Sequence, residues 1–208
     1  DDKKKKILIN SDKIIISTGS EPVSLPGVKF DEKIIVSSTG ALSLSAVPKN
    51  MVVVGGGYIG LEMGSVWSRL GSKVTVVEAL DRIVPTMDHE ISSNFIDSLK
   101  KQGVEFKLQH KVIETIKNDK DVSVKMNSLK DGKETLEKYN SVLLSIGRKP
   151  NIDELNLNKV GIKVDKNNLI EIDNNYQTSV QNIFAIGDVI SGPMLAHKAE
   201  EEAIACVE

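Results

Sequence analysis

Apolar and polar residues alternate along the chain in blocks typical of an α/β protein. Met51–Val54 and Val74–Val77 are apolar runs of strand length, and helical periodicity lies between them until Gly71. The expected inward face of that helix comprises Ile59, Met63, Val66 or Trp67, and Leu70. The pattern therefore predicts a strand, a helix and a second strand over residues 51–78.

A second helix is predicted from about His89 to Gln102. Asp88 is a suitable N-cap, and Gly103 is a suitable stop signal. Its last turn would carry Lys100 and Lys101, and its apolar face would carry Ile91, Phe95 and Leu99.

Shorter strands are predicted after this helix, at Glu105–Leu108, Val112–Ile116 and Val122–Met126. The last alternates apolar and polar residues, as a half-exposed antiparallel strand does, and Asp131-Gly132 predicts a hairpin turn. These segments indicate a small antiparallel β meander.

Three apolar segments end in glycine, at Ile14–Gly19, Val142–Gly147 and Ile183–Gly187. A glycine there either admits a ligand close to the backbone or simply ends the strand. Asp188 and a helix expected to begin near Leu195 favour a cofactor beside the third segment, because a helix N-terminus is electropositive. In contrast, Pro22 and Pro26 predict an irregular connection after the first segment.

The turn after Met51–Val54 has chemistry suited to a dinucleotide. Gly55, Gly57 and Gly60 have the spacing GxGxxG, and the acid Glu78 ends the following strand. These glycines would allow a tight turn, close approach of a pyrophosphate, and close packing of helix on strand. Glycines also mark ordinary turns, but here the strand, the helix and the acid agree.

The acid Glu78 also bears on which nucleotide binds. Its carboxylate can accept hydrogen bonds from both ribose hydroxyls, whereas a 2′-phosphate would place negative charge against it. The sequence therefore favours NAD over NADP.

Composition excludes several other classes of protein. The 208 residues carry a net charge of −2, which gives no broad basic field for nucleic acid or an anionic membrane. No apolar run approaches the roughly 20 residues of a membrane span, and no targeting peptide is recognisable. Cys206 is the only cysteine, which excludes an internal disulfide or a CxxC metal site, and no metal site is predicted.

Taken together, these motifs resemble the dihydrolipoamide dehydrogenases of the flavoprotein disulfide reductase family. The resemblance covers nearly the whole chain and is weakest at Asp1–Asp12 and Asn118–Lys138. The stretches that carry it are ISTGSEP, VSSTGALSL, GGGYIGLEMGSVWSRLG, VTVVE, SIGRKPN and IFAIGDVISGPMLAHKAEEEAIACVE.

The resemblance implies an NAD site with Glu78 on the adenosine ribose, Val112 beside the adenine and Gly147 near the nicotinamide. An ordinary core position explains Val112 equally well. The resemblance also implies Tyr58 as a cover for the nicotinamide pocket, and a half-buried helix residue is the equal alternative. The turn and first helical residues implied in NAD binding are Gly55, Gly56, Gly57, Tyr58, Ile59, Gly60, Leu61 and Glu62.

The resemblance also implies an FAD site. Asp188 would accept a hydrogen bond from a ribityl hydroxyl, although an N-cap role is the alternative. The other implied flavin contacts are Thr18, Gly19, Ser20, Met194, Leu195, Ala196 and His197. His197 and Glu202 have the spacing of the family's catalytic His–Glu pair, but by position they belong to the flavin motif, and residues five apart on a helix point in different directions.

The family's FAD pyrophosphate site, its reactive Cys-x4-Cys segment and its interface domain have no counterpart here, so we expect a fragment. No catalytic residue is expected in it, and we expect the chain alone to be inactive. The expected divisions are a Rossmann-like NAD-binding domain at 25–148, flanked by pieces of an FAD-binding domain at 1–24 and 149–208.

The complete protein would oxidise dihydrolipoamide to lipoamide, passing electrons through a disulfide and FAD to NAD. The implied partners are a dihydrolipoyl-bearing acyltransferase or carrier protein and a second subunit in a homodimer. The implied compartment is the mitochondrial matrix, or the cytoplasm of a bacterium. The alternatives are another reductase of the family, glutathione-type or mercuric, or an NAD-binding module without catalysis. Reductases that use NADP usually lack the ribose acid and carry arginines after the second strand, so Glu78 disfavours them, although Arg82 is close.

Overall fold

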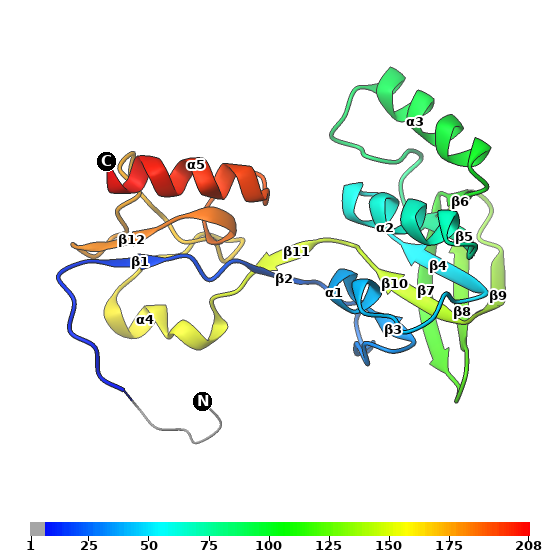
Figure 1. Cartoon of the computed structure of the whole chain (residues 1–208), viewed down its shortest axis with the longest axis horizontal. Helices are drawn as coiled ribbons and strands as arrows, with labels where there is room; N and C mark the ends of the chain where they lie inside the picture. Colours follow the sequence, from blue (N-terminus) through cyan, green and yellow to red (C-terminus); the bar gives the residue numbers. More distant parts are fainter. Residues whose placement is uncertain (1–6) are drawn as a thin grey trace. The chain divides into compact units, whose positions relative to one another are not determined.

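The computed structural model describes residues 7–208, which form two compact units (Figure 1). One unit spans Pro22–Gly147, and the other combines Asp1–Glu21 with Arg148–Glu208. Each has a hydrophobic core of its own. Residues 1–6 of the predicted 1–24 segment lie outside the described residues.

A five-stranded parallel sheet forms the centre of the Pro22–Gly147 unit. Met51 and Val53 contribute to the core on the helical face of the sheet, and Val52 and Val54 to the core on the opposite face. Burial on both faces explains the uninterrupted apolar runs in the sequence and confirms the predicted α/β class. The spatial order is β3 (Ile35–Val36), β10 (Ser141–Leu144), β4 (Asn50–Val54), β5 (Lys73–Glu78) and β6 (Glu105–Leu108).

Two helices of this unit, α1 (Ser38–Leu42) and α2 (Tyr58–Arg69), follow β3 and β4. Of the two alternatives Val66 and Trp67, Trp67 is the buried one, whereas Val66 and Leu70 are 39% and 56% exposed. The buried stripe of α2 runs through Gly60, Leu61, Gly64 and Trp67. Glycines on this stripe let the helix lie close to the sheet, so the small residues define its inner face.

Helix α3 (His89–Lys101) confirms the second predicted helix, and the Asp88 carboxylate accepts a hydrogen bond from the Glu90 amide at 2.8 Å. Of the three residues predicted on its apolar face, Leu99 is 2% exposed, whereas Ile91 and Phe95 are 57% and 37% exposed. Ser92 is buried instead, because its hydroxyl donates to the Ile83 carbonyl at 2.6 Å.

An antiparallel meander covers the other face of the sheet. It comprises β7 (His110–Lys117), β8 (Val122–Ser128) and β9 (Glu134–Tyr139). Val122, Val124 and Met126 of β8 are fully buried in the core against the sheet, as their alternation predicted. The Asp131-Gly132 turn joins β8 to β9 and is also confirmed.

Short elements build the other unit. β1 (Ile14–Ile16) pairs in parallel with β12 (Ile183–Ala185), and β2 (Ser20–Pro22) pairs with β11 (Arg148–Pro150). Pro22, predicted in an irregular connection, therefore ends a strand. The helical segments are η1 (Asp153–Leu155), α4 (Leu157–Val160), η2 (Gly187–Val189) and α5 (Ala196–Val207).

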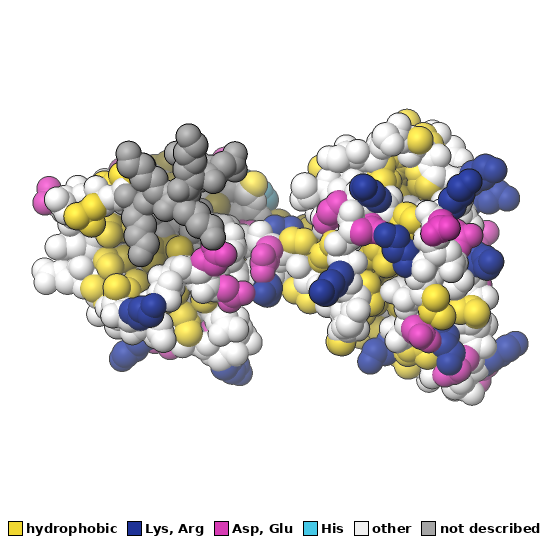
Figure 2. All heavy atoms as spheres, turned by 90° about the horizontal axis from the view of Figure 1, so that it is seen from below, with side chains coloured by type: hydrophobic (Ala, Val, Ile, Leu, Met, Phe, Trp, Pro, Cys, Tyr) yellow, Lys and Arg dark blue, Asp and Glu magenta, His cyan; other side chains and the backbone are white. Residues whose placement is uncertain are grey.

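Lys, Arg, Asp and Glu side chains are intermixed over the face drawn in Figure 2. Within residues 7–208, none of the helices combines the length and apolar character that crossing a bilayer requires.

Candidate functional site

The turn between β4 and α2 requires glycine at two positions. Gly55 has φ +111°, and a Cβ on it would lie 2.4 Å from the Ser145 carbonyl oxygen. A Cβ on Gly60 would lie 2.4 Å from the Ser145 Oγ and 2.5 Å from the Gly55 oxygen. Gly55 therefore lets the turn lie against the backbone after β10, and Gly60 lets α2 lie against the turn, more closely than any side chain would permit.

The start of α2 is open above the third glycine of the turn. Gly57 is the N-cap residue, so no side chain caps the first helical turn. No heavy atom of the described chain comes within 4 Å of the point that a Gly57 Cβ would occupy. This leaves room for an anionic group at the electropositive end of a 12-residue helix.

Glu78 stands beside this turn because β5 is the parallel neighbour of β4. One carboxylate oxygen accepts a hydrogen bond from the Gly56 amide at 2.6 Å, and the other accepts from the Leu80 amide at 2.8 Å. Since each carboxylate oxygen can accept two hydrogen bonds, both retain capacity for ribose hydroxyls. The turn and the acid together fit a dinucleotide.

The other residues predicted for NAD occupy varied environments. Tyr58 is 46% exposed at the start of α2, Ile59 is half-buried and Glu62 is exposed. By contrast, Leu61 and Val112 are 1% and 4% exposed, and their side chains belong to the two cores of the unit. For Leu61 and Val112, any role in binding would fall to the backbone.

Gly147, predicted near the nicotinamide, follows β10 with φ +141°. Its carbonyl accepts a hydrogen bond from the Val23 amide at 3.0 Å. A Cβ there would meet no described heavy atom within 4 Å, so the glycine serves conformation rather than packing.

Asp188, Ser20 and Arg148 form a hydrogen-bonded series in the other unit. The Ser20 hydroxyl donates to an Asp188 carboxylate oxygen at 2.5 Å. Arg148 donates from Nε to the Ser20 Oγ and from Nη2 to the Ser20 carbonyl, both at 2.6 Å. Because the serine oxygen accepts from arginine, its one proton is directed to one carboxylate oxygen of Asp188. The other carboxylate oxygen suits a ribityl hydroxyl as donor. The N-cap of η2 is Ile186, so capping does not explain Asp188.

The segment with Thr18 and Gly19 is tied to Asn151. The Thr18 hydroxyl donates to the Asn151 carbonyl at 2.7 Å, and the Asn151 amide donates to the Gly19 carbonyl at 2.8 Å. Arg148 and Asn151 were not predicted as site residues, although both lie in the SIGRKPN stretch that carries the family resemblance.

Helix α5 begins after Leu195, as predicted, and holds the η2 turn through two further unpredicted residues. Glu202 accepts a hydrogen bond from the Gly187 amide at 2.8 Å, and Lys198 donates to the Gly187 carbonyl at 3.2 Å. Lys198 and Glu202 also form an ion pair at 2.8 Å. Glu202 is therefore committed to this turn, which agrees with excluding a catalytic pair with His197.

The residues predicted at the flavin ring lie at the start of α5. Met194 and Leu195 are half-buried, whereas Ala196 and His197 are exposed. Among the described residues, no group of three or more His, Cys, Asp or Glu is placed to hold a metal ion.

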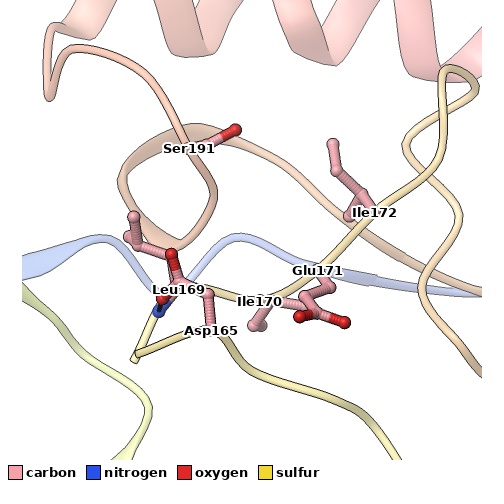
Figure 3. A pocket seen from close by; sticks show the side chains of 6 residues that line it. All are labelled: Asp165, Leu169, Ile170, Glu171, Ile172 and Ser191. Atoms are coloured by element: carbon pink, nitrogen blue, oxygen red, sulfur yellow. Dashed lines mark hydrogen bonds between the residues drawn. The ribbon is translucent and has the colours of Figure 1, made fainter. Parts of the chain in front are cut away.

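A pocket of about 350 Å³ lies in the same unit, near the segment that follows η2 (Figure 3). None of the predicted site residues lines it. Its lining comprises Asp165, Leu169, Ile170, Glu171, Ile172 and Ser191.

Comparison with known proteins identifies the family. The model of the pyridine nucleotide-disulphide oxidoreductases matches residues 1–203. The chain belongs to this family. Its members carry FAD and exchange electrons with NAD(H).

Curated relatives agree with this assignment. Mitochondrial dihydrolipoyl dehydrogenase of Pisum sativum is 54% identical over 94% of this chain and 39% of its own length. Leghemoglobin reductase of Glycine max is 54% identical over 94% of this chain and 37% of its own length. The chain thus spans about two fifths of the length of these relatives.

Solved structures share the fold as well as the sequence pattern. The HOCl-induced flavoprotein disulfide reductase RclA from Escherichia coli is 29% identical, with a TM-score of 0.85 over 95% of this chain and 44% of that one. LpdA from Mycobacterium tuberculosis is 28% identical, with a TM-score of 0.83 over 94% of this chain and 41% of that one.

Proposed function

We propose that this chain is part of an NAD-dependent flavoprotein that oxidises dihydrolipoamide to lipoamide. The observation that carries the proposal is 54% identity to a dihydrolipoyl dehydrogenase over 94% of the chain. In this chain the glycine turn and Glu78 are joined by the hydrogen bond from the Gly56 amide. Electrons would pass from a dithiol through FAD to NAD. The dithiol needs two neighbouring cysteines, and these 208 residues contain only Cys206, so the sulfur chemistry would use residues outside them.

The NAD site in this proposal is the turn Gly55–Glu62 with Glu78. The amides at the start of α2 would bind the pyrophosphate, and Glu78 would accept hydrogen bonds from the adenosine ribose. Tyr58, Val112 and Gly147 would contact the remainder of the nucleotide.

FAD, when bound, supplies the carrier that accepts a pair of electrons and delivers them as hydride. Asp188, oriented by Ser20, would accept a hydrogen bond from its ribityl chain. Thr18 and Gly19 would lie beside the cofactor, and Met194–His197 would line its ring at the start of α5. Support comes from the donor and acceptor set around Asp188, in which one carboxylate oxygen suits a hydroxyl donor.

The domain divisions also remain a proposal, with NAD binding assigned to 25–148 and FAD binding to 1–24 and 149–208. The two compact units, with boundaries after Glu21 and Gly147, lie close to these divisions. We further propose a mitochondrial matrix location, because several relatives are named mitochondrial. The proposed partners are a dihydrolipoyl-bearing acyltransferase or carrier protein and a second subunit.

Nucleotide binding by the protein tests the site, and turnover tests the activity. Calorimetric titration should show NAD⁺ binding that Glu78→Arg weakens. The complete protein should form NADH from NAD⁺ and dihydrolipoamide, whereas residues 1–208 alone should give no turnover. Absence of NAD⁺ binding by folded protein would contradict the site, and absence of turnover by the complete flavin-loaded protein would contradict the activity.

Leghemoglobin reduction is a second candidate, because relatives named leghemoglobin reductase are 54% and 53% identical. The same preparation should be assayed with NADH and leghemoglobin. Faster turnover with leghemoglobin than with dihydrolipoamide and NAD⁺ would favour this candidate.

A further inference from the structure

A buried serine of α3 is connected to the glycine turn by a continuous series of contacts. Ser92 is 2% exposed, and its hydroxyl donates to the Ile83 carbonyl at 2.6 Å. The next amide, that of Val84, donates to the Gly56 carbonyl at 2.8 Å. Gly56 in turn donates its own amide hydrogen to Glu78. The helix is thus joined to both parts of the proposed nucleotide site.

The Val84 backbone is strained. Its φ of +37° lies in the left-handed region, which a β-branched residue rarely adopts, and its side chain is 7% exposed. Such a conformation is unfavourable and persists only where the surroundings enforce it. Its amide is held by Gly56 and its carbonyl by the Met87 amide at 2.9 Å. Ser92 fixes the adjoining carbonyl of Ile83.

The hydrogen bond from Val84 to the Gly56 carbonyl also orients the amide of Gly57. The peptide unit formed by the Gly56 carbonyl and the Gly57 amide is planar and trans, so the two groups point in opposite directions. Holding the Gly56 carbonyl on Val84 therefore directs the Gly57 N–H away from the Val84 loop. There is also little room beside Gly56, because a Cβ added there would lie 3.2 Å from Ile83 Cγ2.

We propose that Ser92 is a positioning residue for the nucleotide site. Acting through Ile83 and Val84, it fixes the Gly56 peptide so that the Gly57 N–H and the Glu78 carboxylate are preorganised for pyrophosphate and ribose. This role rests on the proposed NAD site. It also gives a reason for a buried serine on a face where the sequence pattern predicted apolar side chains.

The adjacent serine provides a matched control. Ser93 is exposed on the same helix, and its hydroxyl donates to the His89 carbonyl at 2.9 Å within that helix. Ser92→Ala and Ser93→Ala remove the same atom, but only the first substitution breaks the connection to Ile83. ADP-ribose is the suitable probe, because it contains the pyrophosphate and the adenosine ribose but needs no flavin.

Calorimetry at a temperature where all variants are folded should show that Ser92→Ala raises the ADP-ribose Kd roughly fivefold, as expected for one net hydrogen bond. Ser93→Ala should change the Kd less than twofold. A lower Tm for Ser92→Ala with an unchanged Kd would overturn the positioning role and leave only a structural one.

A measurement on the unmodified protein decides the matter if Ser92→Ala does not fold. Coupling between two sites is reciprocal, so ADP-ribose should slow hydrogen exchange of the Val84 amide. Exchange of the Ser128 amide, which donates to Lys133 in the β8–β9 hairpin, should not change. Binding without added protection at Val84 would overturn the positioning role, whereas failure of the unmodified protein to bind ADP-ribose would overturn the proposed site itself.

Discussion

The Gly56 amide donates a hydrogen bond to the Glu78 carboxylate across 2.6 Å, so the second position of the glycine turn and the acid at the end of β5 hold each other. A Cβ on Gly56 would lie 3.1 Å from that carboxylate oxygen, a tight contact. Glu78 therefore orders the turn, in addition to the ribose contact proposed for it.

We expect Glu78→Arg to reverse the nucleotide preference. Arginine removes the ribose acceptor and supplies a positive charge suited to a 2′-phosphate. Fluorescence titration should show roughly tenfold weaker NADH binding, since hydrogen bonds to a charged group are lost, together with stronger NADPH binding. Glu78→Gln is the control, because it removes the charge without adding the opposite one and should not improve NADPH binding. An unchanged ratio of the two affinities in Glu78→Arg would exclude the assigned role.

Helix α2 offers a test of glycine packing. In Gly60→Ala the new methyl would meet Ser145 Oγ at 2.4 Å and the rigid Gly55 backbone at 2.5 Å. Overpacking should lower the free energy of unfolding by about 2 kcal/mol in urea titration. At Gly64 the nearest atoms to a new methyl lie at 3.4 and 3.5 Å, an ordinary contact distance. Gly64→Ala should therefore be neutral or more stable by up to about 1 kcal/mol, reflecting alanine's helix propensity.

Ser20→Ala should weaken flavin binding by the complete protein. Without the hydroxyl, Asp188 loses the donor that orients it, and Arg148 loses one of its two acceptors on residue 20. The Kd for FAD, measured by flavin fluorescence after reconstitution, should rise roughly fivefold, the effect of one hydrogen bond. Ser24→Ala removes a hydroxyl that donates to the Val28 carbonyl at 2.6 Å and should leave the Kd unchanged. Equal effects of the two substitutions would argue against a role for Ser20 at the flavin.

Acid should destabilise the Pro22–Gly147 unit through Glu137. Burial alone would raise the pKa of Glu137, but hydrogen bonds from Lys107 and from the Tyr139 hydroxyl, together with the charge of Lys107, hold that pKa below its ordinary value of 4.5. A carboxyl with a lowered pKa stabilises the fold above its unfolded pKa and loses that contribution as pH falls through the folded value. The free energy of unfolding should therefore decrease as pH falls below about 4.5.

Glu137→Gln isolates this contribution in urea titrations at neutral and acid pH. The substitution should reduce stability at neutral pH and flatten the dependence on acid. The free energy of unfolding of this variant should still fall somewhat with pH, because Asp31 also contributes to it. Burial raises the pKa of Asp31, but Lys117 and the amides of residues 33–35 outweigh that effect and lower it well below its ordinary range. An unchanged slope in Glu137→Gln would show that Glu137 does not contribute.

Helix α3 illustrates how far hydrophobic periodicity extends. The pattern and the Asp88 cap located the helix correctly, since both depend on residues within a few positions of each other. The pattern did not show that Ile91 and Phe95 are largely exposed, nor that Ser92 is buried with its hydroxyl on a carbonyl of the preceding loop. Nothing local to the sequence indicates that a polar side chain faces inward there.

The sequence by itself determined the strand–turn–helix–strand of residues 51–78, the meander and the family. Each depends on short-range periodicity or on backbone positions that accept only one residue type, such as Gly55 and Gly60. Only the tertiary structure joined Ser20 to Asp188, 168 positions apart, and to Arg148, 128 positions away. It also decided the strained φ of Val84. Such contacts depend on how distant strands are brought together, and local preferences along the chain do not encode that arrangement.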